Sequence, residues 1–398
     1  MTDQNRTSDT IPFGQLLKKN VRSYSMFIML ALIFIVFAVL TDGINFSARN
    51  VANIFMQNSY ILILASGMVL VIIVGNIDLS VGSVAAFTGA IAAMVYNTGL
   101  GLIPTILITM AAGAVIGVWQ GFWIAFMRVP SFIVTLSSML VFRGLTYVIT
   151  NVTPVSLRDD SFSRITSGFI SSESMMIGDM HLLPWLVGAV LAVLVVIMSI
   201  YSRRNKKKRG FTLQPISALI LRNLFIVALI VILAWKFADF RGLPIVGIVL
   251  AIVVTILTFV TNRTVFGRYV YAVGGNAHSA KLSGINAELV EFFVFVVMGS
   301  LAGLAGLVFA GYMNSALPQA GQLFELDAIA AVFIGGASMS GGIGTVIGAI
   351  VGGLVMGVIN NGMSLMNIGA DWQYVVKGLV LLFAVFYDIY TRRKAGLA

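Results

Sequence analysis

Two carboxylates, Asp78 and Asp327, each stand at the start of a long apolar stretch, which is an unusual place for a charge. An ionisable group inside a hydrophobic segment is costly, so such residues often carry protons or ions. A carboxylate in the first turn of a helix can instead accept hydrogen bonds from free N–H groups and favour the positive end of the helix dipole. Because both residues precede helix-length apolar runs, we favour capping and keep a proton relay as the alternative.

The chain is poor in the other side chains that enzymes and metal sites use. It has no cysteine, and its two histidines, His181 and His278, lie far apart and on opposite expected sides of a membrane. This composition argues against thiolate or His-based metal sites and catalytic triads. No GxxxxGK[ST] loop occurs, and GIGTVIG (342–348) has the wrong spacing for a dinucleotide fingerprint. We therefore expect no catalytic residue, metal or cofactor, and any use of ATP-Mg requires a separate ATPase subunit.

Two amide pairs lie inside apolar stretches, namely Gln57 with Asn58 and Asn360 with Asn361. Amides donate and accept hydrogen bonds, so these side chains, with the two aspartates, could line a path for a polar solute. The alternative is that the amides bond to one another between helices.

These side chains must be positioned by membrane-spanning helices. The chain has 398 residues, of which 59% are hydrophobic and 10% are charged, whereas soluble domains are about 25% charged. Because about 20 apolar residues cross a bilayer, the sequence predicts an all-α polytopic membrane protein with 10–12 transmembrane segments. Twelve segments are expected, and the tenth of them is short: 24–41, 51–75, 77–96, 103–126, 131–151, 182–201, 216–236, 244–262, 289–313, 326–340, 343–361 and 373–390.

The distribution of Lys and Arg predicts the orientation of these segments. With both termini inside the cell, inner stretches hold 17 of the 25 basic residues, while outer stretches hold Arg49, Arg158, Arg164, Lys236 and Arg241. We expect residues 1–23 to be a cytoplasmic tail followed by a retained signal-anchor, and residues 24–398 to be a single membrane domain. The block RRNKKKR (203–209) is interpreted as a topology anchor rather than a nucleic-acid site.

An internal repeat organises the membrane domain. IDLSVGSVAAFTGA (77–90), a Gly-spaced helix (111–126) and VPSFIVT (129–135) are matched by ELDAIAAVFIGGAS (325–338), a Gly-spaced helix (342–362) and WQYVVKG (372–378). The first copy begins at the inner face and the second at the outer face, which predicts an inverted repeat of the kind found in transporters. Repeat one spans about 51–151 and repeat two about 289–390, with inserted helices at about 182–236.

Glycines recur every four residues in the matching helices of both repeats. Such stripes allow close packing of helix backbones in lipid, and sliding of these helices is the alternative functional interpretation. The expected packing glycines are Gly113, Gly117, Gly121, Gly344, Gly348 and Gly352.

Residues 267–285, GRYVYAVGGNAHSAKLSGI, form a weakly basic stretch between two apolar runs. Adjacent glycines supply positive φ, so Gly274-Gly275-Asn276 is expected to form a turn between two short helices on the inner face. This protrusion predicts contact with a soluble partner, and Met127–Ser131 is the other short inner stretch that could provide one. The candidate residues are Gly267, Arg268, Tyr271, Gly274, Gly275, Asn276, Lys281, Ser283 and Gly284.

The outer loop 152–181 carries charges that nearly cancel, among them Arg158, Asp159, Asp160, Arg164 and Glu173. A polar loop of this length often folds or binds something. It is a candidate docking surface for an extracytoplasmic partner, and a solvated connector is the alternative.

Four motifs resemble the bacterial ABC permeases that import ribose, xylose and related monosaccharides. They are residues 267–285, NIDLSVGS (76–83), VPSFIVTL (129–136) and FELDAIAAVFIGGASMSGGIG (324–344). RGLP (241–244), VTNRT (260–264) and NNGMS (360–364) resemble the multiple-monosaccharide (arabinose, galactose, glucose and xylose) subgroup. Ala277-His278-Ser279 departs from the family, which usually has an acidic and a small residue there.

The resemblance implies a homodimeric permease in the bacterial inner membrane, with residues 267–285 as the loop that couples it to an ATPase. It also implies two partners: a periplasmic sugar-binding protein and a cytoplasmic ATPase with two nucleotide-binding domains in one chain. The alternatives are a xylose-only ABC permease and an ion-coupled secondary sugar carrier, for which ionisable groups in mid-span are sparse.

Overall fold

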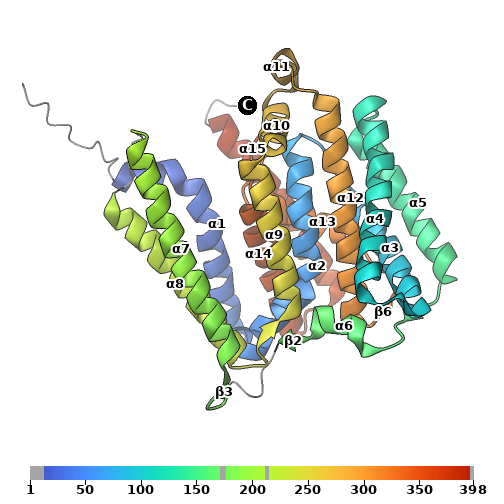
Figure 1. Cartoon of the computed structure of the whole chain (residues 1–398), viewed down its shortest axis with the longest axis horizontal. Coiled ribbons are helices and arrows are strands. Elements are labelled where there is room, and N and C mark those ends of the chain that lie inside the picture. The colour runs from blue at the N-terminus through green and yellow to red at the C-terminus, as the bar shows by residue number, and fades with distance from the viewer. Residues whose placement is uncertain (1–12, 171–175, 211–214, 395–398) are drawn as a thin grey trace, which may run out of the picture. The chain divides into compact units, whose positions relative to one another are not determined.

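The chain folds almost entirely into α-helices with a few two-residue strands (Figure 1). The computed structural model describes residues 13–170, 176–210 and 215–394. Contacts divide the chain into two compact units. The inserted unit comprises Phe169–Leu243, Ser47–Ala52 and the residues up to Ser25, and the main unit comprises Met26–Phe46, Asn53–Gly168 and Pro244–Ala398.

The inserted unit is built on a helix hairpin formed by α7 (Leu182–Lys208) and α8 (Ile216–Ala238). The helices pack closely because Gly188 leaves room for Ala234, whose Cβ would lie 2.8 Å from a Cβ added at Gly188. The neighbouring strands are β2 (Phe169–Ile170), β3 (Met176–Ile177), β4 (Met180–His181) and β5 (Leu243–Pro244). β3 pairs antiparallel with β4.

The main unit contains the other elements, and the first residues of α1 and α2 belong to the inserted unit. In chain order the elements are α1 (Phe13–Leu40), η1 (Ile44–Phe46), α2 (Ala48–Ile73), α3 (Val81–Val95), η2 (Tyr96–Leu100), α4 (Leu102–Gly121), η3 (Phe122–Phe126), α5 (Ser131–Thr150), β1 (Val155–Ser156), α6 (Asp160–Ser167), α9 (Ile245–Arg263), α10 (Val265–Gly275), α11 (Ala277–Leu282), α12 (Ala287–Tyr312), β6 (Ser315–Ala316), α13 (Phe324–Ile334), α14 (Val346–Leu365) and α15 (Ala370–Lys394).

Each of the twelve expected segments corresponds to a helix. Among the described residues, ten helices are long and apolar enough to cross a membrane. The other two are shorter: the apolar part of α1 is Met26–Leu40, and α13 has 11 residues. The all-α polytopic fold is confirmed, and ten of the twelve expected crossings reach full length. α1 already begins at Phe13, within the expected tail, and residues 1–12 lie outside the described part of the chain.

The order of helix lengths in the main unit repeats. α2 to α5 have 26, 15, 20 and 20 residues, and α12 to α15 have 26, 11, 20 and 25. α2 and α12 run antiparallel, because the Tyr60 and Phe309 rings lie 4.8 Å apart while a Cβ on Gly67 would meet the Met298 side chain. Antiparallel copies of one helix order are what an inverted repeat produces.

The glycines of α4 lie where its backbone approaches α12. A Cβ on any of the three would collide with α12 carbonyl oxygens, and the pairs are Gly113 with Gly299, Gly117 with Phe295, and Gly121 with Phe292. Neither lipid nor water fits between backbones this close, so van der Waals contact holds the two helices together.

The glycines of α14 have a corresponding position in the second repeat. Cβ atoms on Gly348 and Gly352 would collide with the backbone of α13, and those on Gly353 and Gly357 would meet α2 at Leu62 and Asn58. The Gly-striped helix of each repeat therefore packs against the first helix of the other. Gly344 was expected in this helix but precedes it, since α14 begins at Val346.

Candidate functional site

Three polar side chains set the helix boundaries between α9 and α12. Thr264 Oγ1 accepts a hydrogen bond from the Gly267 amide (3.2 Å) at the start of α10. Asn276 Oδ1 accepts one from the Ser279 amide (2.8 Å) at the start of α11, and Asn286 Oδ1 accepts one from the Leu289 amide (3.0 Å) at the start of α12. These N-caps produce two short helices that lie at the upper end of α9 and α12 in Figure 1.

The turn between α10 and α11 is made by Asn276 and not by the glycines. Gly274 and Gly275 are the last residues of α10, and neither has a positive φ, so the expectation of left-handed backbone there is wrong. Asn276 is extended, with φ −163° and ψ 100°, and an N-cap with such ordinary angles is enough to redirect the chain. The positive φ of the segment occurs at Gly284, where φ is +82°.

α10 lies directly on the end of α2 and on the loop between α13 and α14. A Cβ on Gly274 would overlap the carbonyl oxygen of Ile73 and lie 2.8 Å from the Gly342 amide nitrogen. That amide donates a 2.8 Å hydrogen bond to the Ile73 carbonyl, and Tyr271 Oη donates one of 2.8 Å to the Gly344 carbonyl. Burial raises the pKa of Tyr271, so the phenol stays protonated as a donor.

The loop between α13 and α14 (335–345) is a contact that the sequence interpretation missed. Gly341 and Gly342 have φ of +79° and +72°, which lets the loop pass close to α10. Its Ser338 Oγ donates a 2.9 Å hydrogen bond to Oδ2 of Asp388, a buried carboxylate of α15. The glycine-rich sequence SMSGGIG was the available signal for such a loop.

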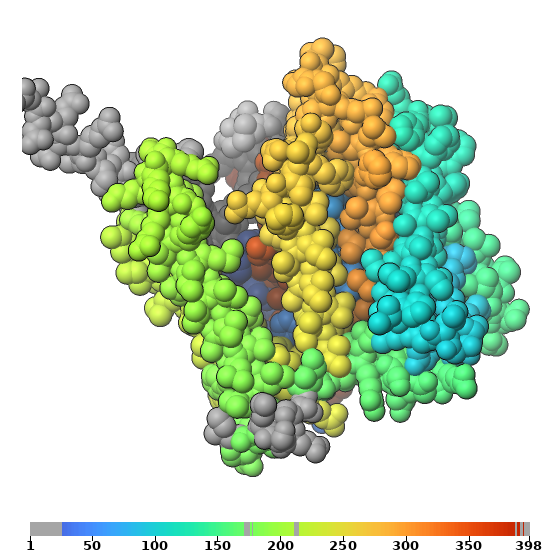
Figure 2. All heavy atoms as spheres, viewed as in Figure 1, coloured from blue at the N-terminus to red at the C-terminus, as the bar shows by residue number. Residues whose placement is uncertain are grey.

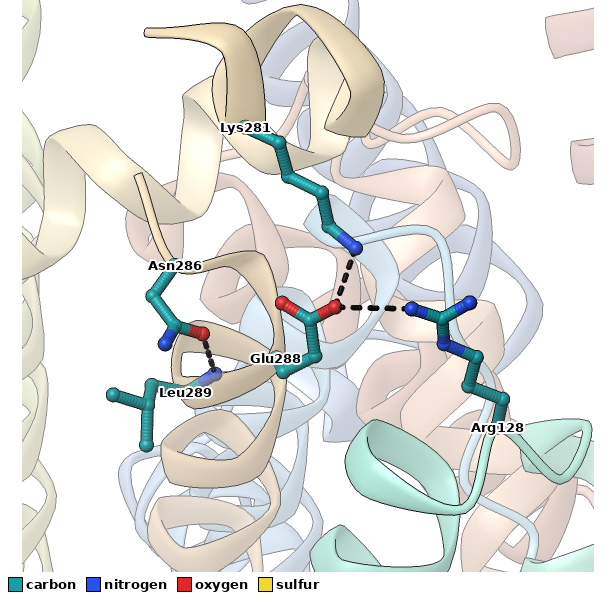
Figure 3. Close-up of polar contacts among 5 residues, drawn as sticks. All are labelled: Arg128, Lys281, Asn286, Glu288 and Leu289. Carbon is teal, nitrogen blue, oxygen red and sulfur yellow. Dashed lines mark hydrogen bonds and ion pairs between the residues drawn. The ribbon is translucent and has the colours of Figure 1, made fainter. Parts of the chain in front are cut away.

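One carboxylate joins α11, α12 and the stretch that follows η3 (Figure 3). Glu288 Oε1, in the first turn of α12, accepts a hydrogen bond from Lys281 Nζ of α11 and forms an ion pair with Arg128 Nη2 at 3.5 Å. The two short inner stretches that the sequence singled out, 267–285 and 127–131, are therefore joined through one acidic residue. A cavity of about 290 Å³ lies between them, lined by Asn76, Ile124, Ala125, Arg128, Val129, Pro130, Ser131, Ala277, Lys281, Ala287, Glu288 and Glu291.

The two short helices are exposed on the surface that faces away from the neighbouring helices. Gly275 to Ser279 and Lys281 to Gly284 are exposed, and Leu282 is 78% exposed at the end of α11. Figure 2 shows this segment, in gold to orange, projecting from the helices beside it. The sequence interpretation did not include Leu282 among the candidate residues. Of the candidate residues, Gly267 is buried and Arg268 is exposed.

Asp78 lies before α3 and organises the short segment that connects it to α2. Its Oδ1 accepts hydrogen bonds from the Ser80 amide (2.8 Å) and from Ser80 Oγ (2.6 Å), and Gln120 Nε2 donates to Ser80 Oγ at 2.6 Å. The N-cap residue of α3 is Ser80, so Asp78 stabilises the turn before the helix instead of capping the helix itself.

Asp327 lies in the first turn of α13 but is held by a cation. Its Oδ2 accepts a 2.8 Å hydrogen bond from Lys377 Nζ of α15, and the two form an ion pair. Arg143, another cation within an apolar segment that bonds to an internal partner, donates through Nη1 to the Ala320 carbonyl.

The four amides divide between local and interhelical bonds. Asn58 Nδ2 donates to the Ile54 carbonyl of its own helix at 2.8 Å. Asn361 Nδ2 of α14 and Gln57 Oε1 of α2 are 3.4 Å apart, a long hydrogen bond between the repeats. Asn360 Oδ1 is buried and accepts no hydrogen bond from the described residues.

The outer loop is folded in its first part. Asp159 is the N-cap of α6, where its side chain accepts a hydrogen bond from the Ser161 amide at 2.8 Å. Tyr96 Oη donates a 2.7 Å hydrogen bond to Asp159 Oδ1, and Tyr96 packs against the fully buried Phe162. β1 pairs with β6 beside α6, and Figure 1 places α6 at the end of the main unit opposite α11. Glu173 lies outside the described residues.

Comparison with known proteins identifies the relatives of this chain. Residues 50–385 match the family described as branched-chain amino acid transport system / permease component. The chain is 39% identical to the xylose transport system permease protein of Haemophilus influenzae, over 94% of this chain and 98% of that protein. The corresponding protein of Escherichia coli K12 is also 39% identical, over 96% of this chain and 95% of that protein.

The ribose import permease protein of Haemophilus influenzae is 34% identical, over 88% of each chain. No solved structure matches the chain. Among the described residues, no cluster of three or more His, Asp or Glu side chains could hold a metal ion. With ten helices able to span a membrane and this likeness to transport components, the chain belongs to the family of ABC transporter permease components that includes the ribose and xylose permeases.

Proposed function

We propose that this chain is the membrane-spanning subunit of an importer that passes monosaccharides from a periplasmic binding protein to the cytoplasm. A separate ATPase binds ATP-Mg and supplies the energy, and the permease acts as a homodimer. The single observation that carries the proposal is the set of contacts made by α10 and α11. In the first repeat, these two helices contact the end of α2 and, through Glu288, Arg128 in the stretch that follows η3. In the second repeat, they contact α12 and the loop before α14.

This arrangement supports a mechanical link between ATP binding and the membrane path. When the ATPase moves α11, the ion pair between Lys281 and Glu288 transmits the movement to α12. The contact of α10 with Ile73 transmits it to the end of α2. Because the helices of the two repeats are packed backbone to backbone, they respond as rigid bodies, as alternating access requires. Gln57, Asn360 and Asn361, which lie where α2 meets α14, are the amides that we expect to border the translocation path.

The orientation follows from the charge distribution. Both termini and the α10–α11 segment face the cytoplasm, where the ATPase binds, and α6 with the 152–181 loop faces the periplasm. The folded α6 is joined to η2, the segment directly after α3, through Tyr96, and so gives a rigid surface on which a binding protein can dock.

The sugar is a pentose or hexose monosaccharide. The chain is 39% identical to a xylose permease and 34% identical to a ribose permease. Because of this difference, the second candidate is a transporter for xylose alone. The multiple-monosaccharide motifs RGLP, VTNRT and NNGMS favour a broader range.

The test is uptake into proteoliposomes that contain this protein with its co-purified ATPase and binding protein. Labelled xylose, arabinose, galactose, glucose, ribose and leucine are compared, with and without ATP. We expect ATP-dependent uptake of several of the sugars and none of leucine. Uptake of xylose alone selects the second candidate, and uptake by the protein without an ATPase refutes the ABC mechanism.

A further inference from the structure

Three helices in the interior of the main unit each leave one aromatic side chain half-buried. Within residues 58–73 of α2 every residue except Tyr60 is buried, and within residues 301–311 of α12 every residue except Phe309 is buried. Phe324, the first residue of α13, is half-buried as well. Over these stretches of α2 and α12, the accessible surface therefore belongs to aromatic rings.

The three rings are in contact with one another. The ring centroids of Tyr60 and Phe324 lie 4.5 Å apart. The ring of Phe309 lies 4.8 Å from that of Tyr60 and 5.0 Å from that of Phe324, and both of these pairs are T-shaped. Three helices that are far apart in the sequence thus leave one aromatic surface partly uncovered, and Tyr60, Phe309 and Phe324 are named here the aromatic cluster.

The aromatic cluster lies where α13 begins. α13 has 11 residues, which is about 16 Å at about 1.5 Å per residue and roughly half of the hydrocarbon core of a bilayer. Its first residue contacts Tyr60, which lies in the middle of the full-length span α2. α13 therefore begins near the midplane of the membrane. In transporters, helices that are interrupted near the midplane form solute sites.

An acceptor without a donor lies one turn further along α13. Asp327 is 5% exposed, and it lies on the same face of the helix as Phe324, three residues before it. Its Oδ2 accepts the hydrogen bond from Lys377, but its Oδ1 is buried and has no hydrogen-bond partner among the described residues. The charge of Asp327 also acts on the phenol of Tyr60. Because a buried acceptor without a donor is costly, a solute that brings a donor to Oδ1 is stabilised there.

A monosaccharide has the chemistry that matches both features. The C–H groups of a sugar ring carry a partial positive charge, so they pack on the negative face of an aromatic ring. Sugar hydroxyls donate hydrogen bonds, and a carboxylate oxygen accepts them. An apolar aromatic surface beside a few well-placed polar groups is the usual composition of a small-molecule site.

We propose that the aromatic cluster is the surface on which the sugar ring passes the midplane of the membrane, and that Asp327 Oδ1 accepts a hydrogen bond from a sugar hydroxyl. This inference rests on the proposed import of monosaccharides. It assigns the recognition of the sugar ring to aromatic side chains of α2, α12 and α13, whereas the amides between α2 and α14 bond only to polar groups.

The first test uses proteoliposomes that contain the permease with its ATPase and binding protein. Tyr60→Leu and Phe324→Leu each keep an apolar side chain but remove the aromatic face, whereas Tyr60→Phe keeps that face. We expect the sugar transported per ATP hydrolysed to fall about two- to tenfold in both leucine variants. Tyr60→Phe should transport at close to the wild-type ratio.

Phe87→Leu is the matched control. Phe87 of α3 is also half-buried, and its ring packs against that of Phe142 with centroids 5.5 Å apart. Its replacement by leucine should lower the thermal unfolding midpoint about as much as Phe324→Leu does, because both variants lose a ring contact. Sugar transport per ATP should stay close to wild type in Phe87→Leu, so a loss confined to the aromatic cluster does not come from reduced stability.

The second test determines whether the aromatic cluster faces water, and it does not depend on which solute is transported. The permease with its ATPase is placed in nanodiscs and treated with a charged thiosulfonate reagent. Phe324→Cys should be modified, and added xylose should slow the reaction. Val193→Cys is the control, because Val193 is exposed in the apolar middle of α7, where lipid excludes a charged reagent.

Two results would each overturn the proposal: leucine variants of the cluster that transport as Phe87→Leu does, or a Phe324→Cys variant that reacts no faster than Val193→Cys. If the wild type shows no ATP-dependent sugar uptake, the proposed function is refuted instead. The labelling rates then still decide whether Phe324 lines an aqueous path.

Discussion

The amide of Gly342 donates a 2.8 Å hydrogen bond to the carbonyl of Ile73, and this bond joins the end of α2 to the loop between α13 and α14. The two residues belong to different repeats and are 269 positions apart in the sequence. Gly274 of α10 lies against both of their backbones. One short helix, α10, is thus in contact with both repeats at the same point.

The first prediction compares the same substitution at adjacent glycines. Gly274→Ala places a methyl group against the Ile73 carbonyl, and such overpacking costs about 1–3 kcal/mol. Gly275→Ala places it in open space with an ordinary φ. ATP-driven uptake should fall severalfold in the first variant and stay close to wild type in the second. Equal loss in both would show that α10 does not transmit force through this contact.

The second prediction concerns Glu288. Glu288→Gln removes the shared partner of Lys281 and Arg128, and partly exposed ion pairs contribute under about 1 kcal/mol to stability. The thermal unfolding midpoint should therefore change little, while the sugar transported per ATP hydrolysed should fall, because α11 loses its side-chain link to α12. Glu291→Gln, one turn further on, is the control. An unchanged transport-to-hydrolysis ratio would remove Glu288 from the coupling path.

The third prediction concerns the ion pair between α13 and α15. Losing one partner of a buried pair costs about 3–5 kcal/mol, because the other charge stays without compensation. Lys377→Met and Asp327→Asn should each lower the unfolding midpoint, and the double variant should lie closer to wild type than either single variant. Additive losses in the double variant would mean that the two residues act separately.

The fourth prediction is a pH dependence at the α6 end of the main unit. The Tyr96 hydroxyl, followed by the Ser161 amide, lowers the pKa of Asp159 below its ordinary value. A lowered folded-state pKa adds stability above the unfolded pKa, and this stability is lost as the pH falls through the folded pKa. Tyr96→Phe should therefore unfold at a lower temperature than wild type at neutral pH, with the difference shrinking in acid below about pH 4.

The control for that experiment is Tyr147→Phe, since the Tyr147 hydroxyl has no hydrogen-bond partner among the described residues. It should follow the wild-type curve at every pH. A Tyr96→Phe difference that is the same at neutral and acid pH would assign the effect to packing against Phe162.

The fifth prediction concerns orientation. The chain has no cysteine, so His278→Cys in α11 and Ser167→Cys at the end of α6 each provide one label site. An impermeant thiol reagent added to intact cells whose outer membrane is permeabilised should label position 167 and not position 278. Inside-out vesicles should give the reverse, and the opposite pattern would invert the proposed topology.

The sequence alone determined the helical membrane fold and the extent of its segments. Hydrophobicity over about 20 residues is a local property, so α2, α5, α7, α8 and α9 lie close to where the pattern placed them. Glycine spacing likewise predicted the close packing in α4 and α14, because a missing Cβ has the same consequence in any membrane helix.

Only the tertiary structure decided which distant residues meet. Nothing local to Lys377 indicates Asp327 as its partner, and nothing near Gly274 indicates Ile73 or Gly342, because these contacts depend on how whole helices cross. The glycine pair of the α10–α11 segment shows the same limit. Its composition suggested a left-handed turn. Close approach to another backbone, however, requires glycine just as strongly as positive φ does. Only the structure shows that close approach to Ile73 is what requires glycine at position 274.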